Sequence, residues 1–589
     1  MNAKYFHKKE ILPAVAGILL SIFTIVWYGF MNPYISIFYR EQSQMFLFDS
    51  DYFMQYMSMP GGTTAYFASF LIQFFRFRWI GILVYLCIFL SFYIVTKEIF
   101  KKFSIFNHSF IIAFIPALLF LPASINMLFD PADELGVIVA LCGFLALTKL
   151  TENRFYYILI PLSITAIFII SGGNVLITVA LYTLYSLFIL PSKKLKYAAT
   201  GLLSFIIPIA VWYFYYLFSF KAACFSLTPF RYPDGALFEP RGIAWWSIIA
   251  VTLTGMLLKK IKAGKKWILI LNTGIAILLL VHIVKQLKPD YENNVKMGFY
   301  AENHQWEDII KTNKKTSINS QSCYYTNLAL QQTGQMAEKM FHYNQIGVSG
   351  LFLELKDHFS CYARSELFFQ LGWINIAQHS VYESMSGYSF LKEPNVRNIK
   401  RLYDCAVIQQ KNDLAQKYGK MLSKTLFYRS YVKSHATSAD YPPALEMKNS
   451  LVLKIPDALE DILENNSSNQ AVFEYLMAWY MLERDYEKAK KCFDRYFPNF
   501  SYSHIPQHYA EFLLLYKRLN NLDDSFFEKY PVSNELRENF DIMDTLLQSN
   551  REKMILGTMK HQFENTYWFY VRFPLVKVQK AQKDEKNIY

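Results

Sequence analysis

Long apolar runs fill the first half of this chain, and they restrict its fold more than any other feature. Up to about Val284 the sequence alternates basic residues with apolar runs of about 20 residues, the length that crosses the hydrocarbon core of a bilayer. After Lys285 it becomes mixed, charged and periodic in the manner of helices. The pattern predicts an all-α fold, with a multi-pass membrane domain over residues 1–286 and a soluble domain over residues 287–589.

The apolar runs predict about nine membrane spans, some of them shorter than the roughly 20 residues that a full crossing needs. The predicted spans are Ile11–Phe30, Trp79–Thr96, Ser109–Leu121, Leu135–Leu150, Phe155–Ile170, Val175–Leu190, Ala198–Phe218, Ile243–Leu258 and Trp267–Val284. Overall composition supports a membrane class, because 53% hydrophobic and 17% aromatic residues exceed what soluble domains usually carry.

Basic residues predict the orientation. Lys and Arg gather in alternate loops, for example at Lys97, Lys149 and Lys193, whereas the loops 122–134 and 171–174 contain neither. By the positive-inside rule the N-terminus is then cytoplasmic. In a bacterium this predicts an inner-membrane protein whose soluble domain is periplasmic. Many of the basic residues behind the net charge of +13 lie in the loops between spans, so nucleic acid is not an expected partner.

The predicted orientation requires one apolar stretch, at about residues 63–75, not to cross the membrane. Its length of about 13 residues falls below the minimum of roughly 17 for a span. We therefore expect an interfacial or re-entrant helix on the outer face, preceded by the Pro60-Gly61-Gly62 break. The first apolar run continues to full spanning length without a small-residue cleavage site, so we expect it to remain as an anchor.

The soluble half has the pattern of paired helices. In residues 473–498 large and small side chains recur as in one tetratricopeptide repeat, which the segment resembles. The residues are Phe473, Leu476, Met477 and Tyr480 on a first helix, Ala489 and Phe493 on a second, and Pro498 at the end. Weaker pairs around Tyr324 and Leu402 predict an irregular α-solenoid of about three to five hairpins.

Two aspartates, Asp49 and Asp51, lie in the first outer loop shortly before the Pro-Gly-Gly break. In an extended or looped segment both side chains can face one point, where they could bind a divalent cation or act as a general base. The same residues are also ordinary turn and N-cap residues.

A second acidic group, Asp130, Asp133 and Glu134, lies in the next outer loop. Spacings of three and four place these carboxylates together on one helical face. Helix capping accounts for them without a ligand, because Asp130 is a good N-cap and acidic residues in the first turn favour the helix dipole. Capping does not account for both acidic groups falling on the same predicted membrane face.

This layout resembles the GT-C superfamily of membrane glycosyltransferases, which use lipid-phosphate-linked sugar donors. The resemblance covers roughly residues 1–290. It implies that Asp49 and Asp51 are catalytic, and that Asp51, Asp130, Asp133 and Glu134 hold a divalent cation such as Mg²⁺ or Mn²⁺. The soluble half lacks the W-W-D-type motif of oligosaccharyltransferases, so protein N-glycosylation is not expected. The chain is also similar to uncharacterised bacterial polytopic proteins that share the Pro-Gly-Gly segment.

Basic residues on the same predicted face could grip the phosphate of a lipid-linked donor, because guanidinium groups bind phosphate bidentately. The candidates are Arg40, Lys221, Arg231 and Arg241. Anchoring at the lipid headgroups is the alternative for them.

A non-enzymatic function remains open from the sequence. A membrane-anchored helical-repeat scaffold would bind envelope proteins or polymers, as helical solenoids often do. The chain has no H-E-x-x-H, P-loop, G-x-G-x-x-G or G-x-S-x-G pattern, and its seven cysteines form no C-x-x-C pair. A zinc hydrolase, a nucleotide-binding domain and a thioredoxin-like redox site are therefore disfavoured.

Overall fold

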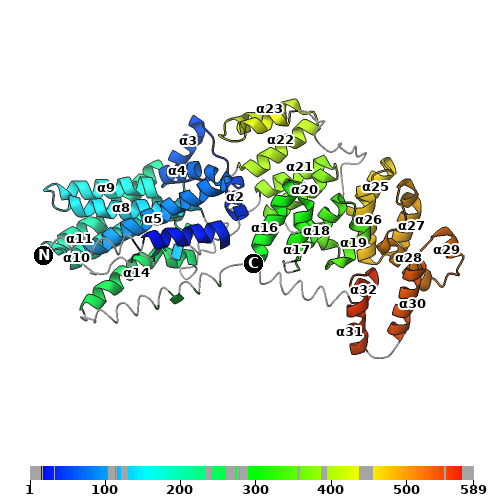
Figure 1. Ribbon diagram of the computed structural model, residues 1–589. Helices are drawn as coiled ribbons and strands as arrows, with labels where there is room; N and C mark the ends of the chain where they lie inside the picture. Colours follow the sequence, from blue (N-terminus) through cyan, green and yellow to red (C-terminus); the bar gives the residue numbers. More distant parts are fainter. Residues whose placement is uncertain are drawn as a thin grey trace. The chain divides into compact units, whose positions relative to one another are not determined.

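Two compact units make up the chain in the computed structural model (Figure 1). Unit 1 contains Met1–Leu287 together with two later segments, Phe390–Arg397 and Met421–Ser430, and unit 2 contains the rest. The structure describes residues 15, 17–31, 34–103, 113, 116–117, 119–120, 130–231, 240–260, 274, 277–278, 281, 285, 289–314, 316, 318–353, 358–386, 394–436, 455–548 and 552–573.

All regular structure among these residues is helical, as the sequence predicts. The helices of unit 1 are η1 (Trp27–Met31), α2 (Tyr34–Gln42), α3 (Ser50–Met57), α4 (Gly62–Ile72), η2 (Gln73–Arg76), α5 (Arg78–Lys102), α8 (Pro131–Leu150), α9 (Tyr156–Ser171), η3 (Gly172–Asn174), α10 (Val175–Phe188), α11 (Lys194–Leu203), α12 (Ile206–Tyr215), α13 (Phe220–Cys224), η4 (Pro229–Arg231) and α14 (Pro240–Lys260).

Four helical stretches are long and apolar enough to cross a membrane: Arg78–Lys102, Pro131–Leu150, Tyr156–Phe188 and Lys194–Tyr215. The prediction of nine is therefore wrong for the described residues. Gly17–Phe30 and Gly242–Thr254 are apolar but shorter, two predicted spans fall together in the third stretch, and the predicted spans Ser109–Leu121 and Trp267–Val284 lie largely outside the described residues.

The third apolar stretch reverses direction at η3. Helix α9 runs antiparallel to α8, whereas α10 runs parallel to it, as the neighbours of each helix along α8 show. In α9, Ile167 lies beside Gly143 and the later Ser171 lies beside the earlier Gly136. In α10, Asn174 lies beside Gly136 and the later Thr178 donates to the carbonyl of the later Ala140. Gly172 has φ of +60°, which suits glycine in a tight turn. The Gly172-Gly173-Asn174 run thus closes a helical hairpin.

Helix α4, predicted at about residues 63–75, is short and packs on α8 and α9 through its small residues. Its start meets the hairpin turn, because Gly61 donates its N–H to the Ile169 carbonyl at 2.9 Å and Gly173 donates to the Ser226 carbonyl at 2.9 Å. Three separate loops therefore meet at one end of the unit 1 bundle. The position of α4 relative to a bilayer stays a prediction.

Unit 2 consists of successive helices, most of them in pairs. They are α16 (Pro289–Glu302), α17 (Trp306–Asn313), α18 (Ser320–Gln332), α19 (Met336–Lys339), η5 (Met340–His342), η6 (Val348–Gly350), α20 (His358–Gln370), α21 (Ile374–Ser386), α22 (Val396–Ile408), α23 (Asn412–Ser423), α24 (Arg429–Ser434), α25 (Ile455–Asn465), α26 (Gln470–Glu483), α27 (Tyr486–Tyr496), η8 (Phe497–Asn499), α28 (Gln507–Leu519), α29 (Phe526–Lys529), α30 (Asn534–Gln548), α31 (Glu552–Phe563) and α32 (Tyr567–Arg572). The first residues of α22 and α24 and the last residues of α23 lie in the segments that belong to unit 1.

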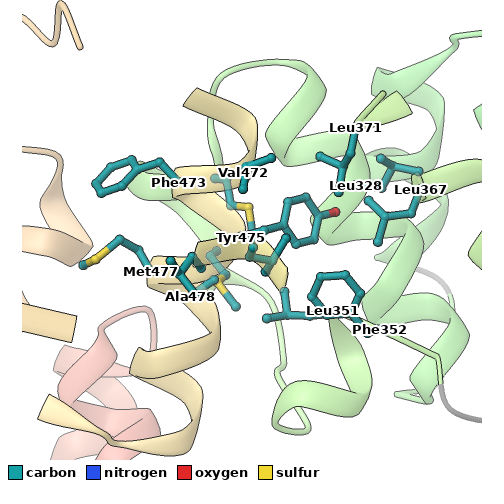
Figure 2. Packing of buried hydrophobic residues seen from close by; sticks show 14 of the residues in the cluster. Leu328, Leu351, Phe352, Leu367, Leu371, Val472, Phe473, Tyr475, Met477 and Ala478 are labelled. Carbon is teal, nitrogen blue, oxygen red and sulfur yellow. The ribbon is translucent and has the colours of Figure 1, made fainter. Parts of the chain in front are cut away.

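The main core of unit 2 lies around α26 (Figure 2). Tyr475 is fully buried and extends toward Leu328 of α18 and Leu367 of α20, with Phe352 nearby. Helices α26 and α27 form a helix–turn–helix where the sequence predicts one, and η8 ends it near Pro498. The kinship with tetratricopeptide repeats stays a prediction.

A buried ion pair lies among these helices. The Arg401 guanidinium, 7% exposed, donates to the Glu366 carboxylate and also lies 3.8 Å from the centre of the Phe369 ring. Removing one charged partner from such a site leaves the other charge buried without compensation. We therefore expect the stability of unit 2 to fall strongly when either member of this pair is replaced.

Candidate functional site

The acidic start of α8 is the first part of the candidate site. Asp130 caps the helix by accepting the Ala132 N–H at 2.9 Å, and Pro131 occupies the first helical position. Capping therefore accounts for Asp130. It does not account for Asp133 and Glu134, whose residues are each 1% exposed although ionised carboxylates are costly to bury.

Two of the predicted phosphate-binding arginines lie in this part of unit 1. Arg231 approaches Asp133 Oδ1 at 3.1 Å and Asp130 Oδ2 at 3.7 Å through Nη2. Arg40, 6% exposed, donates a hydrogen bond from Nη1 to the Tyr85 hydroxyl. The positive charge of Arg40 also acts on Glu134. The structure thus brings together α2, α5, α8 and η4, four elements that are distant in the sequence.

Glu134 is the least satisfied member of the group. Neither Oε1 nor Oε2 has a hydrogen-bond partner among the described residues, and both atoms are buried. A buried acceptor without a donor costs about 1–3 kcal/mol, and more when it is charged. A hydroxyl or amine that donates a hydrogen bond to the Glu134 carboxylate would therefore be bound favourably.

The loops around the acidic group are fixed by polar contacts to the backbone. Asn174 is fully buried, donates to the Leu227 carbonyl at 2.8 Å and accepts a bond from the Trp245 indole at 2.8 Å. Thr64 donates to the Ile170 carbonyl at 2.6 Å. These bonds hold the end of the bundle rigid beside the start of α8.

The first acidic motif lies elsewhere in unit 1. Asp49 is the N-cap residue of α3, in extended conformation, and Asp51 is exposed in the first turn. The ammonium of Lys424 lies 2.6 Å from Asp49 Oδ2, and the Lys424 carbonyl accepts the Phe48 N–H at 3.0 Å. Lys424 belongs to the Met421–Ser430 segment of unit 1.

Within the described ranges, no three His, Cys, Asp or Glu side chains gather in a way that could hold a metal ion. The predicted metal ligands Asp51, Asp130, Asp133 and Glu134 therefore do not form such a group. At Asp130 and Asp133 the neighbouring positive charge comes from Arg231 instead. A divalent cation at these residues stays a prediction, and the proposal made for this chain does not depend on one.

The other two predicted phosphate-binding residues do not add to the group. Lys221 is exposed on α13. Arg241 lies in the first turn of α14, and its side chain is outside the described residues. A phosphate-binding role for Arg40, Lys221, Arg231 and Arg241 stays a prediction.

A second buried polar group was missed by sequence reasoning. The Tyr428 hydroxyl donates to the Glu41 carboxylate, at 2.8 Å from Oε1 and 2.7 Å from Oε2. The Arg76 guanidinium lies 4.7 Å from the centre of the Tyr428 ring. Burial and the Glu41 charge raise the pKa of Tyr428 well above its ordinary value. The only sequence signal was the charged run Arg40-Glu41-Gln42 inside an aromatic segment.

The Asp49–Lys424 pair gives a pH-dependent prediction. The hydrogen bond from Lys424 lowers the pKa of Asp49 below its ordinary 3.8. A lowered folded-state pKa contributes stability that is fully present above 3.8 and is lost as the pH falls through the folded-state value. We expect Lys424→Met to lower the thermal unfolding temperature at neutral pH, and the difference from the parent chain to shrink below pH 3.8 and to vanish once the pH is below the lowered folded-state pKa of Asp49.

The matched control for this measurement is Lys420→Met, which removes an exposed lysine from α23, the helix that ends at Ser423 just before Lys424. We expect this control to melt like the parent chain at every pH. A difference for Lys424→Met that stays the same at a pH low enough to protonate the folded-state Asp49 would show that the aspartate charge is not its cause.

Comparison with known proteins gives one finding. A protein-family model described as "Family of unknown function (DUF6057)" matches residues 8–574. No curated protein and no solved structure matches the chain. These results supply no link to GT-C glycosyltransferases or to tetratricopeptide repeats, so both resemblances rest on the sequence patterns alone.

Proposed function

From the premise that this chain belongs to DUF6057, a family of unknown function, we propose that it is an integral membrane glycosyltransferase of GT-C type. It would use a lipid-phosphate-linked sugar donor on the outer face of the membrane. The four candidate spans support a membrane location. The outer-face orientation rests on the distribution of basic residues.

One observation carries the proposal: among the described residues the buried Glu134 carboxylate has no hydrogen-bond donor, the Arg40 charge acts on it, and its neighbour Asp133 pairs with Arg231. Glu134 supplies two acceptor atoms, and Arg40 and Arg231 supply positive charge. Sugar transfer from a lipid phosphate needs both, because an acceptor hydroxyl must lose a proton and the departing phosphate must be stabilised. Asp133 would hold Arg231 in place through their 3.1 Å contact.

In this proposal Glu134 accepts the proton of the acceptor hydroxyl, and Arg40 and Arg231 bind the donor phosphate. The assignment differs from the sequence-based one, in which Asp49 and Asp51 are catalytic. Lys424 already pairs with Asp49, so Asp49 is less available as a base. The two assignments are separated by the experiment below.

We expect Glu134→Gln to reduce sugar transfer by about a hundredfold or more, because general base catalysis contributes about that much. The fold should persist, since the amide has the same shape and carries no charge to bury. The measurement is release of sugar from polyprenyl-phosphate-linked hexoses by the full chain in proteoliposomes. Glu98→Gln, on a half-buried residue of α5 paired with Lys101 at 2.7 Å, is the control and should transfer normally.

Alanine at both Asp49 and Asp51 tests the sequence-based assignment in the same assay. Loss of transfer in that variant alone would move the catalytic role from Glu134 to these residues. A parent chain that releases no sugar from any of the hexose donors would contradict the proposed function itself.

A second candidate is a membrane-anchored scaffold that binds envelope proteins or polymers. The observation that favours it is the run of packed helix pairs from α16 to α28 in unit 2, such as α20 with α21 and α26 with α27. Stacked helical pairs usually bind partners and do not catalyse. A parent chain that is inactive in the transfer assay but co-purifies from intact envelopes with one stoichiometric polymer or protein would favour this candidate.

A further inference from the structure

The inserted segment Met421–Ser430 packs beside the start of a candidate membrane span, although it follows several helices of unit 2 in the sequence. The Phe427 ring contacts Phe74 of η2, with ring centres 6.0 Å apart, and Phe77, with ring centres 5.2 Å apart. The candidate span Arg78–Lys102 begins at the next residue. A late segment of the chain therefore lies where this helix would leave a bilayer.

The first turns of α5 carry the side chains that are typical of a membrane–water interface. Trp79 is 62% exposed, and Leu83, one turn later on the same side of the helix, is 55% exposed. The Arg78 guanidinium lies 5.6 Å from the centre of the Trp79 ring. Tryptophan is enriched at the level of the lipid headgroups, where one part of its ring is in apolar surroundings and another is wet. Trp79 therefore marks the headgroup level on this helix.

A second exposed aromatic group follows another candidate span, Lys194–Tyr215. Its members are each at least 46% exposed, and they are Tyr213, Phe214, Tyr215, Leu217, Phe218 and Phe220. Within this stretch Tyr216 contacts Phe168 of α9, with ring centres 6.3 Å apart. Phe168 lies one turn before the hairpin turn η3, so this aromatic group lies at the η3 end of the bundle.

The start of α5 lies at the same end. The Tyr85 hydroxyl, in the second turn of α5, accepts a hydrogen bond from Arg40. The Arg40 charge also acts on Glu134 in the first turn of α8, and Gly136 of α8 lies beside Asn174 of η3. Two helices thus present exposed aromatic residues at one end of unit 1, which is the pattern of an aromatic belt at a membrane surface.

The inserted segment presents both apolar and basic side chains at this end. Leu426 is 47% exposed. Arg429 is also exposed, and its Nε atom donates to the Ser423 carbonyl at 3.4 Å. The segment contains Lys424 and Arg429 but no acidic residue, and Asp49 offsets the Lys424 charge at 2.6 Å. An exposed apolar side chain beside an arginine suits an anionic lipid surface.

We propose that Met421–Ser430 is a membrane-surface loop that binds anionic phospholipid. Leu426 enters the headgroup layer, and the Arg429 guanidinium binds lipid phosphates, which match its paired donors. The lipid is a component of the bilayer and not a sugar donor, so the inference does not depend on the proposed function. A chain that transfers no sugar would leave it unaffected.

The test places a bimane label at Leu426→Cys in the full chain, with Cys87, Cys142 and Cys224 replaced by serine because they are not buried. The chain is reconstituted in nanodiscs of phosphatidylcholine, alone or with an equal part of phosphatidylglycerol. We expect a headgroup nitroxide lipid to quench about half of the fluorescence or more, because side chains of interfacial segments lie within about 10 Å of the headgroups. A label at Ser467, exposed among polar residues of unit 2, should be quenched only by a water-soluble nitroxide.

The charge of the loop is tested with Arg429→Gln in the labelled chain. In nanodiscs that contain phosphatidylglycerol, we expect this change to shift the loop about fivefold from lipid toward water, the factor that corresponds to about 1 kcal/mol for one basic residue at an anionic surface. The matched control is Arg154→Gln, at an exposed position at the start of α9 and thus at the opposite end of the bundle. It should leave the quenching at position 426 unchanged.

Folding of the variants is checked by thermal unfolding in detergent, where exposed substitutions at Leu426 and Arg429 should leave the melting temperature unchanged. Quenching at position 426 by the water-soluble nitroxide alone, as at position 467, would overturn the proposal. A label shielded from both nitroxides would overturn it too, because Leu426 would then be covered by protein. Quenching that responds neither to phosphatidylglycerol nor to Arg429→Gln would contradict the binding of anionic lipid.

Discussion

Replacing Gly62 with alanine should prevent unit 1 from reaching its native packing. A Cβ atom at this position would lie 1.7 Å from the Tyr56 carbonyl oxygen and 2.6 Å from its carbon. Real Cβ contacts are never so short, so the backbone joining α3 to α4 must move. Overpacking costs about 1–3 kcal/mol when side chains can adjust, and we expect at least about 3 kcal/mol here because backbone is involved.

The measurement is the yield of monodisperse full chain in detergent, followed by its thermal unfolding temperature. Gly17→Ala is the matched control in the same unit, since no atom lies within 4 Å of its Cβ position. Alanine there should be neutral or stabilising by up to about 1 kcal/mol, the difference between the two residues in a helix. Normal yield and melting for Gly62→Ala would contradict the close approach of these two segments.

Replacing Arg401 with leucine should destabilise unit 2 by about 3–5 kcal/mol, because it leaves the Glu366 charge buried and uncompensated. Glu366 is 2% exposed, and in the described part of the chain the bond from Gln370 at 2.9 Å would be left to it. The measurement is denaturant unfolding of the full chain, followed by tryptophan fluorescence.

The double variant Arg401→Leu with Glu366→Leu distinguishes a lost charge pair from lost packing. Apolar residues of similar volume often replace a buried ion pair at little cost, so the double variant should recover most of the stability. Lys311→Ala removes an exposed partner of Glu307 at 3.6 Å and should cost at most about 1 kcal/mol. A double variant no more stable than Arg401→Leu would indicate that packing, and not charge, sets the effect.

Local sequence patterns predicted the helices well. The spacing of Phe473, Ala489 and Phe493 predicted the helix pair that the structure has at α26 and α27. The Gly172-Gly173-Asn174 run predicted the turn between α9 and α10. Both are decided by periodicity and turn chemistry within a few residues. Capping by Asp130 was predicted for the same reason, and the structure has its Oδ1 atom 2.9 Å from the Ala132 nitrogen.

Contacts between distant residues were only partly predictable. The positive-inside rule placed Arg231 and Asp133 on one face, and the structure has them 3.1 Å apart. No such rule relates Lys424 to Asp49 or Tyr428 to Glu41, which are 375 and 387 positions apart. Helical periodicity shows which face of a segment is buried but not which other segment covers it. Span counting failed for another reason, because the predicted spans near Gly17–Phe30 and Gly242–Thr254 form apolar helices shorter than a full crossing.

Unit 1 is discontinuous in the sequence, and this has a consequence for its biosynthesis. Lys424, which contacts Asp49, and Tyr428, which contacts Glu41, come from Met421–Ser430, a segment that leaves the ribosome long after the last apolar helix. Domains generally fold as their chain emerges, but this unit cannot be completed until translation has passed Ser430. The half-built unit must therefore wait without these partners of Glu41 and Asp49, and a gene truncated after Leu287 would encode a bundle arrested at that stage.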